Sequence, residues 1–161
     1  MTKLQLQAVQ IESGNRAALA LMAQLHRRAF IEQDERPWNI KAFEQLLASQ
    51  GCEAFLYYLE DSPVGFAFVR NVCDEAELIS IAIDPVSQGQ GFAKQVLKHL
   101  LKQLVSWGVY TLFLEVRQDN QKAVQLYRSV GFKKIGERKA YYQTLSGKRL
   151  DADVFSLAVR Q

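Results

Sequence analysis

The stretch "SIAIDPVSQGQGFAKQVLKHLL", residues 80–101, joins an apolar run, a proline, two glycines and a long helical pattern. The apolar run over 76–84 predicts a strand buried on both faces, and Pro85 ends it because proline cannot donate to a sheet ladder. Apolar residues at helical spacing then predict a helix over about 89–106. A chain that passes from a strand through glycines into a helix is typical of segments that bind phosphate groups.

These glycines complete neither of the familiar phosphate-binding motifs. A P-loop needs Lys and Ser or Thr after its second glycine, and a dinucleotide fingerprint needs a third glycine where Lys94 stands. The physical requirement remains, because the first N–H groups of a helix have no internal partner and carry partial positive charge. We therefore predict that a diphosphate is surrounded by the main-chain N–H groups of Gln88, Gly89, Gln90, Gly91, Phe92 and Ala93. The alternative is a glycine-containing loop without a ligand.

Outward from this stretch, hydrophobic periodicity predicts the order strand, two helices, three strands, helix, strand, helix and two strands. The expected ranges are 3–9, 15–30, 40–48, 53–60, 64–72, 76–84, 89–106, 109–116, 121–130, 132–144 and 149–159. This order predicts an α/β fold of the mixed α+β kind, with a mostly antiparallel central sheet of about seven strands and about four helices. The strand–helix–strand unit predicts a parallel pair joined by a right-handed connection. We expect a single domain over residues 1–161.

Composition excludes several classes of function. The chain is 48% hydrophobic and 23% charged, and its net charge of +3 is too mild for a nucleic-acid surface held by charge alone. No apolar run approaches the ~20 residues that cross a bilayer, and the N-terminus does not resemble a signal peptide, so we expect a cytoplasmic protein. Cys52, Cys73, His26 and His99 are isolated in the sequence, which predicts reduced, buried thiols and no metal site.

Two motifs resemble the acyl-CoA-binding signature of the GNAT family of N-acetyltransferases. The first is Gln88-x-x-Gly91-x-Ala93 after "IAIDP", and the second is the segment "NQKAVQLYRSVGF" over 120–132. The predicted element order also matches that family over nearly the whole chain. The resemblance implies an enzyme that uses acetyl-CoA as cosubstrate and transfers its acetyl group to a primary amine.

Four further stretches are similar to the bacterial ribosomal-protein alanine N-acetyltransferases, and they are "PW" at 37–38, "DEAELISIAIDP" at 74–85, "LFLEVRQDN" at 112–120 and "RKAYY" at 138–142. This similarity implies that the acceptor is the N-terminal α-amine of a small-subunit ribosomal protein. Ala140 departs from the pattern, because a polar residue is expected there, and the turn within 143–155 is altered. Both departures lie toward the acceptor side of the expected site.

Acetyl transfer to an amine by direct attack needs a base for the amine and an acid for the departing thiolate. A peptide α-amine titrates near ~8, so a base must take its proton near neutral pH. The resemblance assigns this role to Glu115, whose alternative is a surface carboxylate paired with Arg117. Tyr127 is the expected acid, since a phenol near ~10 can protonate a thiolate whose thiol lies near ~8.5. Its alternative is a packed core aromatic.

The remaining expected site residues divide between cofactor and acceptor. The strand over 79–83 should bulge so that the main chain of Ile81, Ala82 and Ile83 can pair with the pantetheine arm. The resemblance places Asn120 on the pantetheine or the diphosphate arm, although asparagine also favours helix N-caps. Trp38, Tyr141 and Tyr142 are candidates for lining the acceptor groove, with simple packing as the alternative. The acidic residues Glu32, Asp34 and Glu35 either attract a basic peptide or are solvated.

Two other functions remain open at this point. The same fold supports many acceptors, so the amine could belong to a small molecule such as a polyamine, an amino acid or an aminoglycoside. A non-catalytic acyl-CoA sensor is an alternative of another class. Besides acetyl-CoA and the acceptor, we expect no nucleic acid or membrane partner, and a monomer or weak dimer.

Overall fold

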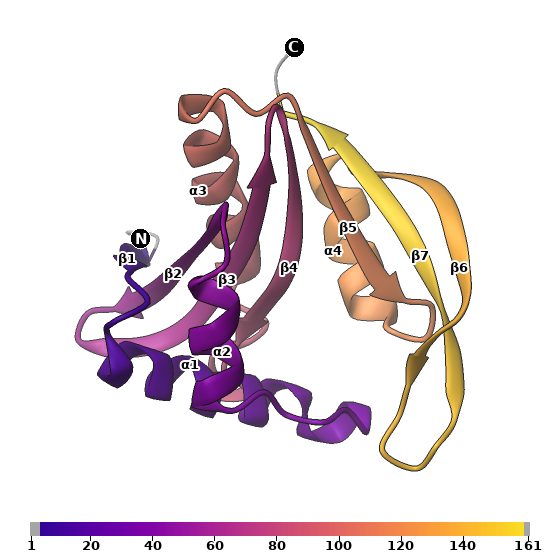
Figure 1. The fold of residues 1–161 in the computed structure, drawn as a ribbon, viewed down its shortest axis with the longest axis horizontal. Coiled ribbons are helices and arrows are strands. Elements are labelled where there is room, and N and C mark those ends of the chain that lie inside the picture. Colours follow the sequence, from indigo (N-terminus) through magenta and orange to yellow (C-terminus); the bar gives the residue numbers. More distant parts are fainter. Residues whose placement is uncertain (1–3, 160–161) are drawn as a thin grey trace.

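The computed structural model describes residues 4–159, which form one seven-stranded sheet with helices on both faces (Figure 1). The strand order across the sheet is β1-β2-β3-β4-β5-β7-β6. The elements are β1 Gln7–Ile11, α1 Arg16–Phe30, α2 Ile40–Leu47, β2 Cys52–Leu59, β3 Ser62–Val72, β4 Glu75–Ile83, α3 Phe92–Ser106, β5 Thr111–Arg117, α4 Gln121–Val130, β6 Lys133–Gln143 and β7 Arg149–Ala158. The predicted fold class and element order are confirmed.

The first strand differs from its prediction. It was expected over 3–9 and lies at Gln7–Ile11, while residue 3 is outside the described residues. The segment before it is held by α3 instead, because the Gln95 side chain accepts from the Leu6 amide at 3.1 Å and donates to the Leu4 carbonyl at 2.8 Å. Two short 3-10 helices, Ile31–Gln33 and Pro85–Ser87, were not predicted.

Three helices begin with a side-chain cap, and α3 does not. Asparagine side chains at positions 15, 39 and 120 each accept from a main-chain N–H three residues later, which fixes the starts of α1, α2 and α4. The N-cap of α3 is Gly91, which has φ 83° and no side chain to offer. The first N–H groups of α3 therefore remain available to a ligand.

The strands β4 and β5 are paired over only part of their length. Their parallel pairing joins Glu75–Leu78 to Thr111–Leu114, which confirms the predicted parallel pair. Beyond these residues the strands separate toward their C-terminal ends, and α4 lies behind the opening (Figure 1). The main chain of β4 that follows Leu78 thus has an edge that β5 does not cover.

A β-bulge in β4 lies where the two strands separate. Phe68 of β3 pairs with Ser80 and Val69 pairs with Leu78, so Ile79 is an extra residue without a partner. This confirms the predicted bulge. The expectation that β4 is buried on both faces is wrong for the segment from Ile79 to Ile81, which is half-buried. The reason is the missing neighbour on the β5 side.

Two apolar cores lie on opposite faces of the sheet. One packs β2–β5 and β7 against α3 and α4, with Phe92, Leu97 and Phe155 among its enclosed side chains. The other packs β1–β4 against α1 and α2 around Phe43 and Phe66. Because α1 and α2 pack on β2, β3 and β4, the same face of β5, β7 and β6 is left for polar side chains.

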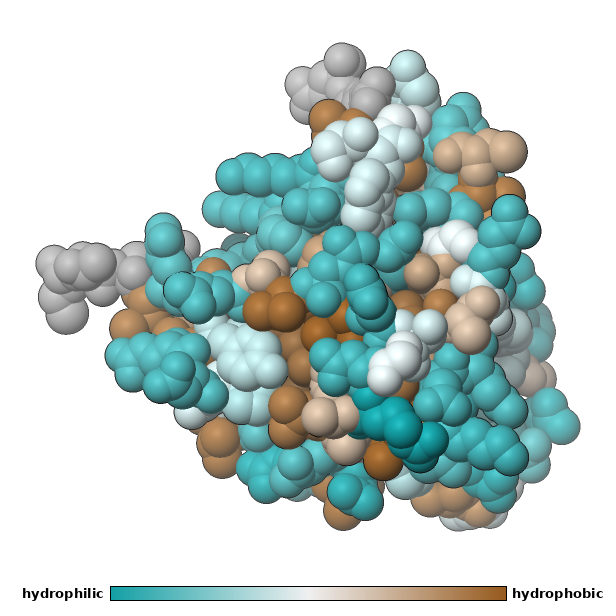
Figure 2. Space-filling view, turned by 60° about the vertical axis from the view of Figure 1, so that its left-hand side comes forward, coloured by the Kyte–Doolittle hydropathy of each residue, from teal (hydrophilic) through white to brown (hydrophobic). Residues whose placement is uncertain are grey.

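Seen from the β1 side, the surface is mostly hydrophilic, with a broken hydrophobic patch near the centre (Figure 2). Cys52 is buried as expected, but Cys73 is exposed in the tight turn between β3 and β4, where its φ is 57°, so the prediction of a buried thiol is wrong there. Within residues 4–159, no helix has the length and apolarity to span a membrane.

Candidate active site

The turn before α3 presents main-chain donors to open space. Gly89 and Gly91 have φ values of 80° and 83°, and a Cβ added at either would meet no atom within 4 Å. Among the described residues, no acceptor is within hydrogen-bonding distance of the main-chain N–H groups of residues 89–94. Adjacent unpaired N–H groups at a helix start form a concave site for an anion. The predicted diphosphate cradle therefore has the geometry that it requires.

Gln88 supports this turn rather than lining it. Its amide N–H donates to the Pro85 carbonyl at 3.3 Å, and its side-chain Nε2 donates to the Ile83 carbonyl at 3.0 Å. Phe92 anchors the other end, because its side chain is 2% exposed within the apolar core. Of the six predicted residues, Gln88 thus has its main-chain N–H already engaged, and the other five keep theirs open.

The uncovered edge of β4 offers main-chain groups from alternate residues. The Asp84 amide donates to the Val64 carbonyl of β3 at 2.7 Å. In an antiparallel ladder the residues that bond to a neighbour alternate, so Ala82 and Ser80 also face β3. Ile81 consequently directs its N–H and carbonyl groups toward the gap, whereas Ile83 offers only its N–H there, because its carbonyl accepts from Gln88 Nε2. Of the predicted pantetheine contacts, Ile81 and Ile83 fit this geometry, and Ala82 does not.

Glu115 lies at the point where β5 leaves β4. Its side chain is on the sheet face that α1 and α2 leave uncovered and is 13% exposed. Its carboxylate pairs with Arg138 of β6, with Oε1 2.7 Å from the guanidinium Nε. The alternative of a pair with Arg117 is wrong, because Arg117 binds Asp119 and Glu35 instead. A hydrogen bond to the Glu115 carboxylate, together with burial, raises the pKa of Tyr141.

Tyr127 meets both interpretations that the sequence left open. Its ring is buried in the core below α4, with its centroid 5.6 Å from that of Phe132. Burial raises the pKa of its hydroxyl well above the ordinary value, so the phenol stays protonated at neutral pH. Among the described residues the hydroxyl has no hydrogen-bond partner, and it is not sealed from solvent. The ring is packed and the hydroxyl is free to donate.

Tyr142 links these groups into one cluster. Its hydroxyl donates to the main-chain carbonyl of Glu115 at 3.4 Å. Burial raises its pKa, and so does its proximity to Glu35, Glu115, Tyr141 and Tyr127. Glu115, Tyr141 and Tyr142 therefore lie close together, and Glu35 and Tyr127 are near enough to affect the pKa of Tyr142.

Trp38 does not belong to this cluster. Its indole stacks on the ring of His26, with centroids 5.3 Å apart, and also contacts Phe43 at 5.2 Å. Its amide donates to His26 Nδ1 at 3.2 Å. His26 is 3% exposed, and burial lowers its pKa to about 4. Trp38 thus anchors the end of the loop between α1 and α2, which is the packing alternative.

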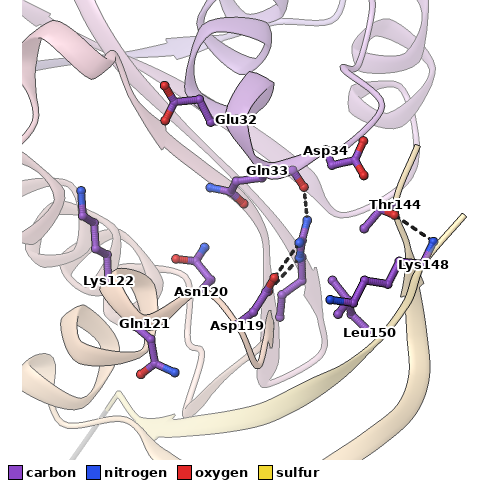
Figure 3. A pocket seen from close by; sticks show the side chains of 11 residues that line it. Glu32, Gln33, Asp34, Asp119, Asn120, Gln121, Lys122, Thr144, Lys148 and Leu150 are labelled. Atoms are coloured by element: carbon purple, nitrogen blue, oxygen red, sulfur yellow. Dashed lines mark hydrogen bonds and ion pairs between the residues drawn. The ribbon is translucent and has the colours of Figure 1, made fainter. Parts of the chain in front are cut away.

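A cavity of about 520 Å³ opens between that loop, the start of α4 and the β6–β7 turn (Figure 3). Asn120 lines it and also caps α4, because its Oδ1 accepts from the Ala123 amide at 3.2 Å. The N-cap interpretation is therefore confirmed. Glu32, Lys122 and Lys148 also border the cavity. Its wall carries both charges, which suits a zwitterionic or peptide-like acceptor more than a simple anion.

Arg117 holds the loop against the end of β5. Its guanidinium is 8% exposed and binds Asp119 through Nε and Nη2, at 3.0 and 2.9 Å. It also donates to Glu35 at 3.1 Å and to the Gln33 carbonyl. Glu35 is consequently not free to bind a peptide. Its pKa is raised, because burial outweighs the neighbouring guanidinium.

Asp34 joins the same loop to the β6–β7 turn. Its carboxylate accepts from the Ser146 hydroxyl at 2.5 Å and amide at 3.3 Å, and its carbonyl accepts from the Leu145 amide at 2.8 Å. These hydrogen bonds lower the pKa of Asp34. Of the acidic residues expected to attract a peptide, Glu32 alone lacks such a partner among the described residues.

Sequence reasoning missed Arg138 and His26, and it gave Arg117 the wrong partner. Arg117 and Arg138 stand inside the quoted motifs, but the partners of Arg117 include a loop residue 82 positions away. His26 had no signal beyond helical spacing, since its partner Trp38 is 12 positions further along the chain.

Comparisons with known proteins identify the family of this chain. The acetyltransferase (GNAT) family model matches residues 14–132, so the chain belongs to the acetyltransferase (GNAT) family, whose members use acetyl-CoA. It is an N-acetyltransferase. It is 45% identical, over 75% of this chain and 83% of the relative, to the ribosomal protein bS18-alanine N-acetyltransferase of Haemophilus ducreyi.

Two further relatives cover more of the chain. N-alpha-acetyltransferase RimI of Mycobacterium tuberculosis is 36% identical, over 84% of this chain and 85% of the relative. The crystal structure of the ribosomal-protein alanine N-acetyltransferase from Escherichia coli has a TM-score of 0.82 at 33% identity, and the match covers 98% of this chain and 96% of that chain. The similarity extends from the β1 region to the β6–β7 hairpin.

Proposed function

We propose that this enzyme acetylates the N-terminal α-amine of a protein, with a small-subunit ribosomal protein as its substrate. The relatives named above as ribosomal protein bS18-alanine N-acetyltransferases support this acceptor. The observation that carries the proposal is the position of Glu115. Its carboxylate lies on β5 just beyond the last residue paired with β4, beside Tyr141 and Tyr142, and it lines a cavity of about 270 Å³ together with Arg138 and Glu77.

The residues present fit coenzyme A. Main-chain N–H groups of Gly89, Gln90, Gly91, Phe92 and Ala93 would bind the diphosphate, since they donate to no described residue and the space beside Gly89 and Gly91 is open. Ile81 and Ile83 would pair with the pantetheine amides along the free edge of β4, as an added strand does. Asn120 caps α4 and lines the 520 Å³ cavity, and we propose that its side chain also contacts the cofactor. Bound acetyl-CoA supplies an acetyl group activated as a thioester.

Glu115 would act as the general base and Tyr127 as the general acid of the acetyl transfer. Glu115 accepts a proton from the acceptor ammonium, and the neutral nitrogen forms a bond to the acetyl carbon as the carbon–sulfur bond breaks. Tyr127 donates its proton to the departing sulfur, and the second proton of the nitrogen then reprotonates the Tyr127 hydroxyl. The raised pKa of Tyr127 keeps it in the protonated form that this role needs. The N–H of Ile81 or Ile83 would stabilise the carbonyl oxygen.

A peptide panel tests the acceptor. Peptides with varied N-terminal residues, Ala-initiated ones included, are incubated with acetyl-CoA and the protein, and mass spectrometry locates the acetyl group. We expect modification at the α-amine and a clear preference among N-terminal residues. Acetylation confined to free polyamines, amino acids or aminoglycosides would overturn the peptide acceptor. Binding of acetyl-CoA without turnover of any amine would favour a sensor instead.

The setting follows from the proposed substrate. We propose that residues 1–161 act as one acetyltransferase domain in the cytoplasm, where ribosomal proteins are made, and as a monomer or weak dimer. Light scattering across a range of protein concentrations checks the last point, because a stable dimer would show twice the mass of 18.3 kDa at the lowest concentration.

A further inference from the structure

The strand β6 has a wide bulge beside Glu115. Arg138 pairs with Ala152 of β7 and Tyr142 pairs with Leu150, so three residues of β6 lie opposite the single residue Asp151. Within this bulge Ala140 has φ 51°, and its amide donates to the Asp151 carboxylate at 2.7 Å. A left-handed conformation is costly for alanine, so the surrounding contacts must maintain it.

This bulge places two side chains on one carboxylate. In a regular strand, residues three apart point to opposite faces. Here Arg138 and Tyr141 both reach Glu115, the first by an ion pair of 2.7 Å and the second through its hydroxyl. The guanidinium also lies over the Tyr141 ring, with Cζ 5.1 Å from the centroid. The geometry is therefore built to hold a cation at Glu115.

Arg138 differs from the other cations near this face in being easy to displace. Its side chain is 57% exposed, and within residues 4–159 its one ion pair is with Glu115. Arg117 is 8% exposed and bound by several groups. Lys134 and Lys139 each bridge two carboxylates. Arg70 is paired with Glu77 on the neighbouring strands. A carboxylate that is 13% exposed has room for one cation at a time.

We propose that Arg138 is an exchangeable counter-ion, which pairs with Glu115 in the absence of acceptor and gives up this carboxylate to the acceptor ammonium. This inference rests on the proposed function, in which Glu115 receives the acceptor amine. Arg138 thereby sets the threshold for binding, since an acceptor must displace a guanidinium. An uncharged N-terminus leaves the pair of Arg138 with Glu115 in place and gains no binding energy from this carboxylate. The ring of Tyr141 and the open solvent accommodate the displaced side chain.

Binding to the CoA-saturated enzyme tests this role without turnover. The dissociation constant of an Ala-initiated peptide is measured by calorimetry for the wild type and for Arg138→Gln, Arg138→Lys and Lys139→Gln. Removal of the competing charge in Arg138→Gln should lower the constant about two- to fivefold, the range of a partly exposed ion pair. Arg138→Lys should stay near the wild type. Lys139→Gln loses the same charge from the same bulge, and it should change nothing because Lys139 does not contact Glu115.

The N-acetylated form of the same peptide separates competition from a structural role. It carries no N-terminal cation, so Arg138→Gln should leave its dissociation constant unchanged. Weaker or unaltered binding of the free peptide by Arg138→Gln would overturn the proposal, and so would equal gains for both peptides. Failure of the proposed function appears separately, as absence of peptide turnover by the wild type. In that case the dissociation constants of Arg138→Gln and the wild type are compared for the amine that the wild type does acetylate. If the wild type binds no amine, both proposals fail.

Discussion

On the β4 side of the gap, the groups that face the opening are main-chain amides of Gly89, Gln90 and Gly91. On the β5 side they are side chains, with Glu115 and Arg138 at the centre. The first set is positioned by local conformation within a few residues, and it has no partners among the described residues. The second set is positioned by contacts between strands and loops far apart in the sequence. Substitutions on the two sides should therefore affect different substrates.

The largest effect is expected on kcat when Glu115 is replaced, because both substrates must react beside this carboxylate. In Glu115→Gln the side chain keeps its shape but cannot accept a proton, so kcat should fall about 10²- to 10³-fold. The dissociation constant of acetyl-CoA should stay within about twofold, because no main-chain donor changes. Steady-state kinetics and calorimetry measure both quantities. Glu77→Gln is the control, since Glu77 lies on the same face but pairs with Arg70 at 2.8 Å. A kcat within a few-fold of the wild type would exclude Glu115 as the base.

The next effect concerns the acceptor side alone. Arg117→Gln leaves Glu35, Asp119 and the Gln33 carbonyl without their donor, which should cost about 3 kcal/mol of unfolding free energy. The loop then loses its support, so KM for the peptide should rise while KM for acetyl-CoA does not. Urea unfolding and kinetics check both results. Arg70→Gln breaks a half-exposed pair and should cost below about 1 kcal/mol. Equal rises of the two KM values would contradict the division into two sides.

A smaller effect concerns the cofactor side alone. Gly91→Ala adds a Cβ that meets no protein atom but projects into the space before the open amides. We expect the dissociation constant of CoA to rise about tenfold, with peptide binding to the CoA complex retained. Alanine at this φ also costs about 1–2 kcal/mol of stability. Gly108→Ala has the same strain, since φ is 82° and its Cβ is likewise free, and it should leave CoA affinity alone. Equal losses of affinity in both variants would show that strain, not access, is responsible.

The smallest effect is a pH dependence from His26. Burial lowers its pKa to about 4, whereas an unfolded histidine titrates near ~6.5, so unfolding takes up a proton between these values. Stability is complete above the unfolded pKa and is lost as pH falls toward the folded one, by about 1 kcal/mol between pH 7 and 5.5. Protonated His26 also cannot accept from the Trp38 amide.

Urea unfolding at both pH values measures this slope. His26→Gln should remove most of it, and KM for the peptide should rise with acidification in the wild type only. His99→Gln is the control for the effect on KM. Burial and Lys102 lower the pKa of His99 as well, but this histidine lies on the other face of the sheet, away from the loop that Trp38 anchors. An unchanged slope in His26→Gln would contradict this assignment.

The features that sequence could predict are those set by neighbouring residues. Helix α4 was placed at its observed bounds, because Asn120 and Gly131 are its two caps and both are local signals. The turn through Gly89 and Gly91 follows from the positive φ that glycine favours. The bulge in β4 was inferred from the family resemblance, and no alternation of residues indicates it directly.

The acceptor side could not be predicted in the same way. Alternation places Glu115 and Arg117 on one face of β5, which suggested a pair, but the register of β6 brings Arg138 closer. That register depends on a three-residue bulge at Ala140, a residue type that does not favour the left-handed conformation. Trp38 was expected in the groove, and its actual partner His26 is identified only once α1 and α2 are packed together.

Because Ile79 is an extra residue in β4, the number of residues in this strand matters for function. With Ile79 removed, the pairs Phe68–Ser80 and Val69–Leu78 would become neighbouring steps of a regular ladder, and the local bend of β4 where it leaves β5 would be lost. No chemical group would be lost, and every side chain named in the mechanism would still be present. A single-codon deletion would therefore disable the cofactor side more thoroughly than most replacements, and a scan limited to point substitutions would never reveal it.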